Sequence, residues 1–198
     1  MLTSTVSHPT LVDTLWDRDK AAVRNIVLAV FGSAALWISA KIQVPFFPVP
    51  MTMQTLVVLA IGMAYGWRLG AATILLYLAE GAAGLPVFAG TPEKGIGLAY
   101  MVGPTGGYLA GFLVAAVAVG WLAERGWDRS ILKTAAAMFI GNALIYLLGL
   151  LWLGTIVGWD KPVLDWGLLP FLPGDAAKLL LAAIAMPLAW RLVKRDKR

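Results

Sequence analysis

Two ionisable residues one helical turn apart are the clearest candidates for chemistry in this sequence. Asp175 and Lys178 lie in the apolar stretch Gly174-Asp175-Ala176-Ala177-Lys178, and their i,i+3 spacing places both on one face of a helix. One interpretation is an internal ion pair, with Asp175 also stabilising the helix N-terminus. The other is a pair that faces a cavity and recognises a polar anionic ligand. The two interpretations are compatible, since ionisable groups in apolar spans usually mark function.

Glu80 is a third ionisable residue within an apolar segment, close to its outer end. It could contact a ligand or a loop, or it could only reach the membrane interface. The sequence leaves these alternatives open.

A glycine-rich motif, Gly103-Pro104-Thr105-Gly106-Gly107-Tyr108, stands where another apolar segment begins. The free backbone N–H groups of such a helix end, next to the Thr105 hydroxyl, could bind a carboxylate or a carbonyl group. Glycines at 103, 107 and 111 also recur every four residues, which would let another helix approach closely. Gly107 therefore has a packing interpretation as well as a binding one.

A second polar motif opens an earlier apolar segment, in Val49-Pro50-Met51-Thr52-Met53-Gln54-Thr55. Thr52 and Gln54 could donate hydrogen bonds to a ligand. They could equally cap a helix and satisfy loop carbonyls. The pattern does not separate these alternatives.

These residues are set in a chain too apolar for a water-soluble fold. Its 198 residues are 60% hydrophobic and 14% charged, and the mean hydropathy is +0.78. Soluble domains are roughly half apolar and about a quarter charged. We therefore expect an integral membrane protein with an all-α fold and a single domain over residues 1–198.

Several kinds of chemistry are excluded by residues that the sequence lacks. It contains no cysteine and one histidine, His8, which lies in the polar N-terminal tail at 1–20. It has no G-x-x-x-x-G-K-[ST] phosphate loop. We expect no metal site, no cofactor and no enzymatic activity. The net charge of +5 falls in short basic runs between apolar segments, which indicates membrane topology rather than nucleic-acid binding.

Six membrane-spanning helices fit the apolar runs, since a span needs roughly 20 residues. The long run from Met51 to Thr91 should be split at Gly66-Trp67-Arg68. The expected helices are approximately 21–41, 52–65, 68–83, 104–123, 131–153 and 174–192. Of the 16 Lys and Arg residues, 12 fall on one side of this layout and 4 on the other. The basic side, which carries both termini, is assigned to the cytoplasm.

The connections on the outer side are rich in proline, which fixes φ and ends helices. They span 41–50, 84–103 and 158–173, and we expect them to fold over a site. The first helix carries a flat face of Ala29, Gly32 and Ser33. This face could pack inside the bundle or dock a partner within the membrane.

Taken in order across six spans, these motifs resemble the BioY family, the biotin-specific S components of energy-coupling factor (ECF) transporters. The motifs that carry the resemblance are Val49–Thr55, Gly84–Gly90, Gly103–Leu109, Gly141-Asn142 and Gly174–Lys178. The resemblance implies a six-helix S-component fold with an outward-facing pocket, capped by the first and third external loops. It also implies a membrane coupling subunit and two ATPase subunits, docked through small residues of the first helix. Residues 29–33 end in serine where a strict Ala-x-x-x-Ala pattern has alanine.

The resemblance places Asp175 and Lys178 in the biotin site, and Thr105, Gly106 and Tyr108 along the pocket wall. The chemistry of biotin fits these residue types. A carboxylate such as Asp175 suits the two ureido N–H donors, and Lys178 suits an acceptor oxygen. The side chains that could surround its apolar rings are Leu85, Val87, Phe88 and Tyr108.

The sequence thus predicts high-affinity capture of biotin from outside and its uptake across the cytoplasmic membrane of a bacterium. An S component for another vitamin, such as thiamine or riboflavin, is the first alternative. A small intramembrane enzyme is a further alternative, but the sequence offers no nucleophile or metal cluster for it.

Overall fold

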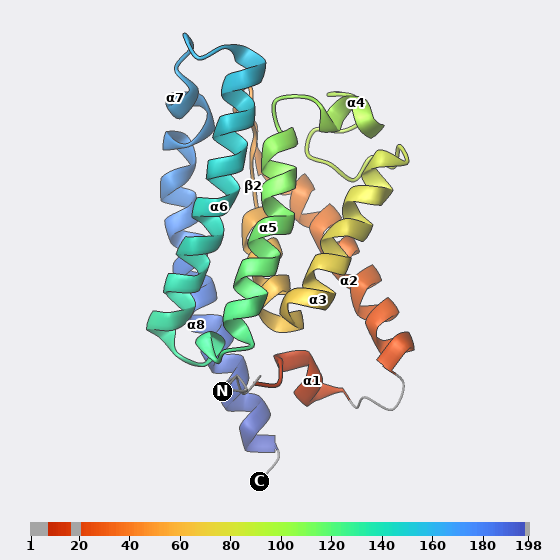
Figure 1. Ribbon diagram of the computed structural model, residues 1–198, viewed down its shortest axis with the longest axis vertical. Coiled ribbons are helices and arrows are strands. Elements are labelled where there is room, and N and C mark those ends of the chain that lie inside the picture. Colours follow the sequence, from red (N-terminus) through yellow and green to blue (C-terminus); the bar gives the residue numbers. More distant parts are fainter. Residues whose placement is uncertain (1–7, 17–20, 197–198) are drawn as a thin grey trace, which may run out of the picture.

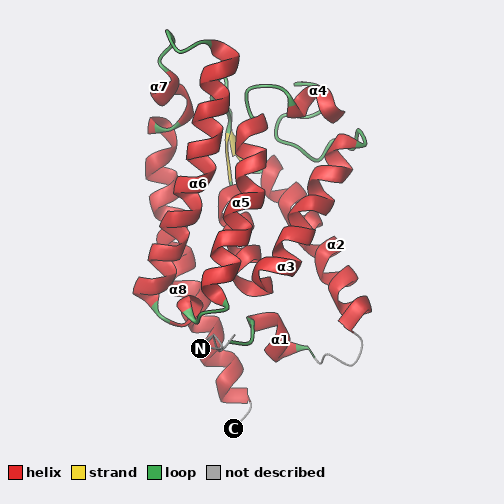
Figure 2. Cartoon of the chain, viewed as in Figure 1, coloured by secondary structure: helices red, strands yellow, loops and turns green. Residues whose placement is uncertain are grey.

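The structure, a computed structural model, describes residues 8–16 and 21–196. Residues 1–7 and 17–20 of the predicted polar tail lie outside the described residues, as do Lys197 and Arg198. The described chain is helical apart from one two-stranded ribbon (Figures 1 and 2). This is the all-α class that the composition predicts.

The elements follow one another along the chain as helices, two short strands and two 3-10 turns. They are α1 Leu11–Leu15, α2 Ala21–Lys41, β1 Gln43–Val44, β2 Met51–Thr52, α3 Gln54–Ala82, α4 Gly97–Met101, α5 Gly106–Ala123, η2 Trp127–Arg129, α6 Ile131–Val157, α7 Val163–Gly167, η3 Leu169–Phe171 and α8 Leu172–Asp196. The strands pair antiparallel, with Gln43 opposite Thr52 and Val44 opposite Met51. Figure 1 shows α1 and the end of α8 at one end of the bundle, and α4 and α7 at the other.

α3 is not one straight helix. Its backbone leaves the helical region at Gly66, where φ is 78° and ψ is 173°. A Cβ atom built on Gly70 would lie 3.2 Å from the Cα atom of Gly62, although eight residues of a straight helix rise about 12 Å. The chain therefore turns back on itself at Gly66 (Figure 1). The predicted break at Gly66-Trp67-Arg68 coincides with this turn.

Five stretches of the described residues are long and apolar enough to cross a membrane, with α3 and its turn counted as one. They are 21–41, 54–82, 106–123, 131–157 and 163–193. The chain is therefore a multi-pass membrane protein. The count of six spans and the cytoplasmic position of both termini stay predictions.

Element boundaries differ from the expected ones where loops take up residues that were assigned to helices. α3 begins at Gln54 rather than at 52, because Met51 and Thr52 join the ribbon. α5 begins at Gly106 rather than at 104, because the turn before it is held by Trp152, whose Nε1 donates to the Gly103 carbonyl at 2.9 Å. α6 continues to residue 157, and α8 already begins at 172.

A short helix, α1, forms inside the segment that the sequence analysis treats as a polar tail. The Thr10 side chain caps it by accepting a hydrogen bond from the Asp13 N–H at 3.2 Å. Val12 is buried, and Arg24 at the start of α2 forms an ion pair with Asp13 at 3.1 Å. This stretch is therefore part of the packed fold.

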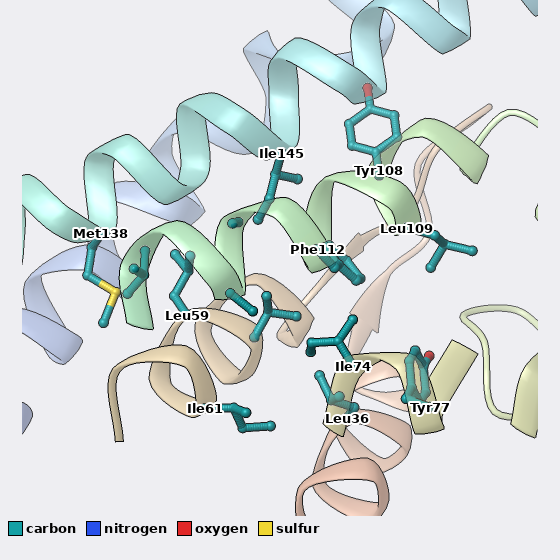
Figure 3. Packing of buried hydrophobic residues seen from close by; sticks show 14 of the residues in the cluster. Leu36, Leu59, Ile61, Ile74, Tyr77, Tyr108, Leu109, Phe112, Met138 and Ile145 are labelled. Carbon is teal, nitrogen blue, oxygen red and sulfur yellow. The ribbon is translucent and has the colours of Figure 1, made fainter. Parts of the chain in front are cut away.

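The core lies between α3, α5 and α6, where buried aliphatic and aromatic side chains from all three helices meet (Figure 3). Glycines allow the close approach of α5 to α6. A Cβ on Gly111 would lie 2.8 Å from the Ile145 Cα atom, and one on Gly107 would lie 2.2 Å from the Trp152 Cβ atom. Gly107 and Gly111 therefore allow two helices to pack closely, as the packing interpretation of their spacing predicts.

We predict that Gly111→Leu destabilises the bundle, because its side chain would meet the backbone of α6. Overpacking of this kind costs about 1–3 kcal/mol, which for a chain of this size lowers the melting temperature by roughly 2–12 °C. Intrinsic tryptophan fluorescence in detergent would measure it. Ala110→Leu, on the exposed face of α5, is the control and should melt like the unmodified protein. Equal melting temperatures for the two variants would contradict this packing.

Candidate binding site

A cavity that is partly open to solvent is lined by residues of the loops at the α4 and α7 end of the bundle. Its walls come from all three proline-rich outer loops and from α3, α5, α6 and α8. The lining residues are Val49, Pro50, Met51, Thr52, Gln54, Thr55, Ala89, Tyr100, Thr105, Tyr108, Leu109, Phe112, Ile145, Tyr146, Phe171 and Asp175.

Asp175 is the carboxylate residue in this wall. It lies in the first turn of α8 and is 5% exposed. Its Oδ1 atom accepts hydrogen bonds from the Thr55 hydroxyl at 3.2 Å and from the Lys178 ammonium at 3.0 Å. Its Oδ2 atom accepts a hydrogen bond from the Tyr146 hydroxyl. A buried carboxylate is thus oriented by three donors from three different helices.

Lys178 stands behind Asp175 and does not line the cavity. Its Nζ atom donates to the Thr52 carbonyl at 2.7 Å, to the Thr55 hydroxyl at 3.1 Å and to Asp175. These three acceptors use the three N–H groups of an ammonium. Lys178 therefore holds Asp175 and the ribbon together here, and its contact with a ligand oxygen stays a prediction.

Four more of the predicted site residues line the same cavity, namely Thr52, Gln54, Thr105 and Tyr108. The Gln54 side chain is fixed because its Nε2 donates to the Tyr77 hydroxyl at 2.8 Å. The Tyr108 hydroxyl donates to the Gly167 carbonyl at 2.8 Å. Both side chains are held by bonds within the protein, so they shape the wall more than they offer free polar groups.

Gly106, Gly107 and Phe88 are predicted site residues that do not line the cavity. The space beside Gly106 is filled by the Met101 carbonyl, 2.1 Å from where its Cβ would lie. Gly107 packs against Trp152 in the same way. The Phe88 ring is buried between two tyrosines, stacked on Tyr100 at 4.9 Å and edge-on to Tyr77 at 5.5 Å. All three residues support the wall from behind.

Glu80 also lies away from the cavity, and it accepts a hydrogen bond from the Ser33 hydroxyl. Ser33 and Gly32 are buried against α3, where a Cβ on Gly32 would lie 2.5 Å from Thr73 Cγ2. Ala29 is half-buried. Of the two interpretations of this face of α2, internal packing describes Gly32 and Ser33 here, and partner docking stays a prediction.

The polar and aromatic lining residues that were not among the predicted ones are Thr55, Tyr100, Phe112, Tyr146 and Phe171. Thr55 and Tyr146 bind Asp175 directly, and the Phe171 ring lies 5.9 Å from the Phe46 ring. That contact joins the first and third outer loops beside the cavity. A tyrosine in the otherwise apolar stretch of α6 was a signal for Tyr146, but nothing in the sequence relates it to Asp175.

Tyr100 fixes the second outer loop at the cavity. Its hydroxyl donates to the Ala89 carbonyl at 2.8 Å, and burial raises the pKa of Tyr100. The hydroxyl therefore stays protonated, and remains a donor, well beyond neutral pH.

Comparison with known proteins places the chain in a family. The sequence profile of the BioY family matches residues 12–195. A probable biotin transporter BioY of Pyrococcus horikoshii is 37% identical, over 85% of this chain and 96% of that protein. The biotin transporter BioY of Thermotoga maritima is 36% identical, over 88% of this chain and 98% of that protein. The chain belongs to the BioY family.

The fold of this BioY-family chain agrees with a solved structure. It is similar to a crystal structure of the S component for biotin from an ECF-type ABC transporter, with a TM-score of 0.70 and 24% identity. The similarity covers 89% of this chain and 94% of the other. The expected S-component fold is therefore confirmed.

We predict that Lys178→Met lowers the stability of this BioY-family protein more than Lys178→Met combined with Asp175→Leu. The single variant leaves a buried carboxylate without its cation, which typically costs about 3–5 kcal/mol. The double variant removes both charges. Melting temperatures of the two proteins at pH 7.5 would measure the difference. A double variant that melts at or below the single variant would show that the pair is not a coupled buried ion pair.

Proposed function

We propose that this protein captures biotin from outside a bacterial cytoplasmic membrane and takes part in its uptake as the S component of an ECF transporter. The observation that carries this proposal is the carboxylate of Asp175 in the wall of a mostly apolar cavity, in a chain of the BioY family. The transporters of Pyrococcus horikoshii and Thermotoga maritima to which it is similar are named for biotin.

The acceptor capacity of Asp175 supports a ligand that donates hydrogen bonds. A carboxylate offers about four lone-pair sites, and Thr55, Lys178 and Tyr146 take three. One site stays open to the ligand. The ureido ring of biotin presents N–H donors, so Asp175 suits this end of the molecule. An analogue without the donor would leave a buried carboxylate lone pair without a hydrogen bond, and this cost makes the site discriminate against that analogue.

The walls of the cavity support the rest of the ligand. Tyr108, Phe112 and Ile145 line it from α5 and α6, and Phe171 lines it from the third outer loop. Apolar and aromatic walls with a few polar groups are typical of small-molecule sites. They suit the apolar bicyclic ring and the alkyl chain of biotin.

Transport needs a source of energy that this sequence does not contain, since it has no phosphate-loop motif. We propose that a membrane coupling subunit with two ATPase subunits supplies it, in accord with the ECF-type transporter whose S component shares this fold. The protein itself binds and releases biotin without changing it chemically, so it is a transporter subunit and not an enzyme.

We predict that Asp175→Asn weakens biotin binding by tenfold or more, because an amide in this place loses the charge-assisted bond to the ureido ring. Isothermal titration with purified protein in detergent would measure the dissociation constant. Asp165→Asn removes a carboxylate from the exposed surface of α7 and should bind biotin normally. Undiminished affinity in Asp175→Asn, or displacement of biotin by thiamine or riboflavin, would refute the assignment.

We further predict that efficient biotin uptake requires the energising subunits. A strain that cannot make biotin, carrying this protein together with the coupling and ATPase subunits, should accumulate labelled biotin. The matched control carries ATPase subunits inactivated in their phosphate-loop lysines and should lose accumulation while biotin binding persists. Equal accumulation in the two strains would show that this chain transports without ATP hydrolysis.

A further inference from the structure

In the loop between α3 and α4, four carbonyl groups accept hydrogen bonds from side chains outside the loop, and the Phe88 carbonyl also accepts one from the Thr91 hydroxyl at 2.7 Å. The Tyr77 hydroxyl donates to Val87 O at 2.9 Å, the Lys41 Nζ atom to Phe88 O and Thr91 O at 3.0 Å each, and the Tyr100 hydroxyl to Ala89 O at 2.8 Å. These bonds determine the orientation of successive peptide groups in the part of the loop that reaches the cavity.

The orientation of the peptide group between Phe88 and Ala89 determines where the Ala89 N–H points. This peptide group is trans, because the cis peptide bonds of the described chain precede Pro48 and Pro92. In a trans peptide the N–H points opposite to the carbonyl. The Phe88 carbonyl faces the Lys41 ammonium, which does not line the cavity. The Ala89 N–H therefore points away from Lys41, while Ala89 itself lines the cavity.

This N–H is a donor without an acceptor among the residues that the structure describes. Ala89 is 4% exposed, and no residue of 8–16 or 21–196 accepts a hydrogen bond from its backbone nitrogen. Most buried backbone N–H groups are paired, because leaving one unpaired costs about as much as a lost hydrogen bond. An unpaired N–H in a cavity wall is therefore placed to meet a ligand.

The position of Ala89 relative to Asp175 indicates which part of a ligand it meets. Figure 1 shows α8 and the loop that carries α4 on opposite sides of α5. Asp175 reaches the cavity from α8, and Ala89 reaches it from that loop. An ionised carboxylate only accepts hydrogen bonds and a backbone N–H only donates. The cavity thus suits a molecule with donors at one end and an anionic acceptor at the other.

We propose that the Ala89 backbone amide binds the carboxylate of the substrate, opposite the ring end held by Asp175. This inference rests on the proposed function. In this proposal the Lys41 ammonium is a positioning group, because the bonds from Lys41 to the Phe88 and Thr91 carbonyls keep the Ala89 N–H turned toward the cavity. Charge-assisted bonds to a carboxylate are stronger than neutral ones, so a single amide can set a preference for the anion.

The test replaces the amide and leaves the side chain in place. Incorporation of lactate for alanine at position 89, by suppression of a stop codon, turns the amide into an ester without an N–H. Alanine inserted at 89 by the same route is the reference. Lactate at Ala83, whose N–H donates to the Ala79 carbonyl at 2.9 Å, is the matched control, because it also loses one N–H but lies outside the cavity lining.

Each protein is titrated with biotin and with biotinol, in which a neutral alcohol replaces the carboxylate. The reference and the Ala83 ester should prefer biotin by about tenfold or more, as one charge-assisted hydrogen bond allows. The Ala89 ester should lose most of this preference through weaker binding of biotin. An undiminished preference, or an equal loss for both ligands, would overturn the carboxylate assignment. Failure of the reference protein to bind biotin would instead refute the proposed function itself.

Discussion

The site depends on how one negative charge is kept inside an apolar bundle. A carboxylate buried among membrane-spanning helices is costly unless a cation and hydrogen-bond donors surround it. Lys178 supplies the cation for Asp175, and its other two N–H groups bind the ribbon and the start of α3. The same ammonium group therefore compensates the charge and connects three separate parts of the chain. The Thr52 carbonyl of β2 accepts the third N–H of Lys178, so this bond also holds β2 beside α8.

The second outer loop follows the same principle without a carboxylate. Backbone groups in a poorly hydrated region need partners inside the protein. Hydrogen bonds within this loop, such as that from the Lys94 N–H to the Gly90 carbonyl at 2.9 Å, supply some of these partners. Tyrosine hydroxyls and the Lys41 ammonium bind further carbonyls. Several N–H groups of the loop have no acceptor among the described residues, and that of Ala89 belongs to a residue that lines the cavity. A loop held in place by such bonds discriminates between ligands better than a mobile loop, because binding then carries little ordering cost.

How far the sequence predicts this arrangement depends on whether the signal is local. Signals from residues near one another on one helix or turn correspond to features of the structure. They are the i,i+3 spacing of Asp175 and Lys178, the break at Gly66 and the glycine pattern before Gly111. Other features depend on contacts between residues that are not neighbours on one helix. They are the pairing of the ribbon, the bonds of Thr55 and Tyr146 to Asp175, and the bond of Ser33 to Glu80. One sequence carries no local signal for such contacts. Phe88 is an example. Its apolar side chain would suit either the cavity wall or the layer behind that wall, and its ring contacts with Tyr77 and Tyr100 place it in the layer behind.

Apart from the Arg24–Asp13 ion pair, polar contacts join α2 to the body of the bundle and to the second outer loop. Ser33 binds Glu80 in the body of the bundle, whereas Lys41 at the outer end of the same helix holds the loop that carries Ala89. The faces of α2 that do not meet α3 expose large apolar side chains, including Phe31 and Ile38, which in a membrane are free to contact lipid or another protein. The Phe88 carbonyl also accepts a hydrogen bond from the Thr91 hydroxyl at 2.7 Å. Lys41 and Thr91 therefore hold this carbonyl together, and because the peptide group is planar, they also fix the direction of the Ala89 N–H. The polar end of α2 thus helps to shape the cavity wall, while its exposed faces stay apolar.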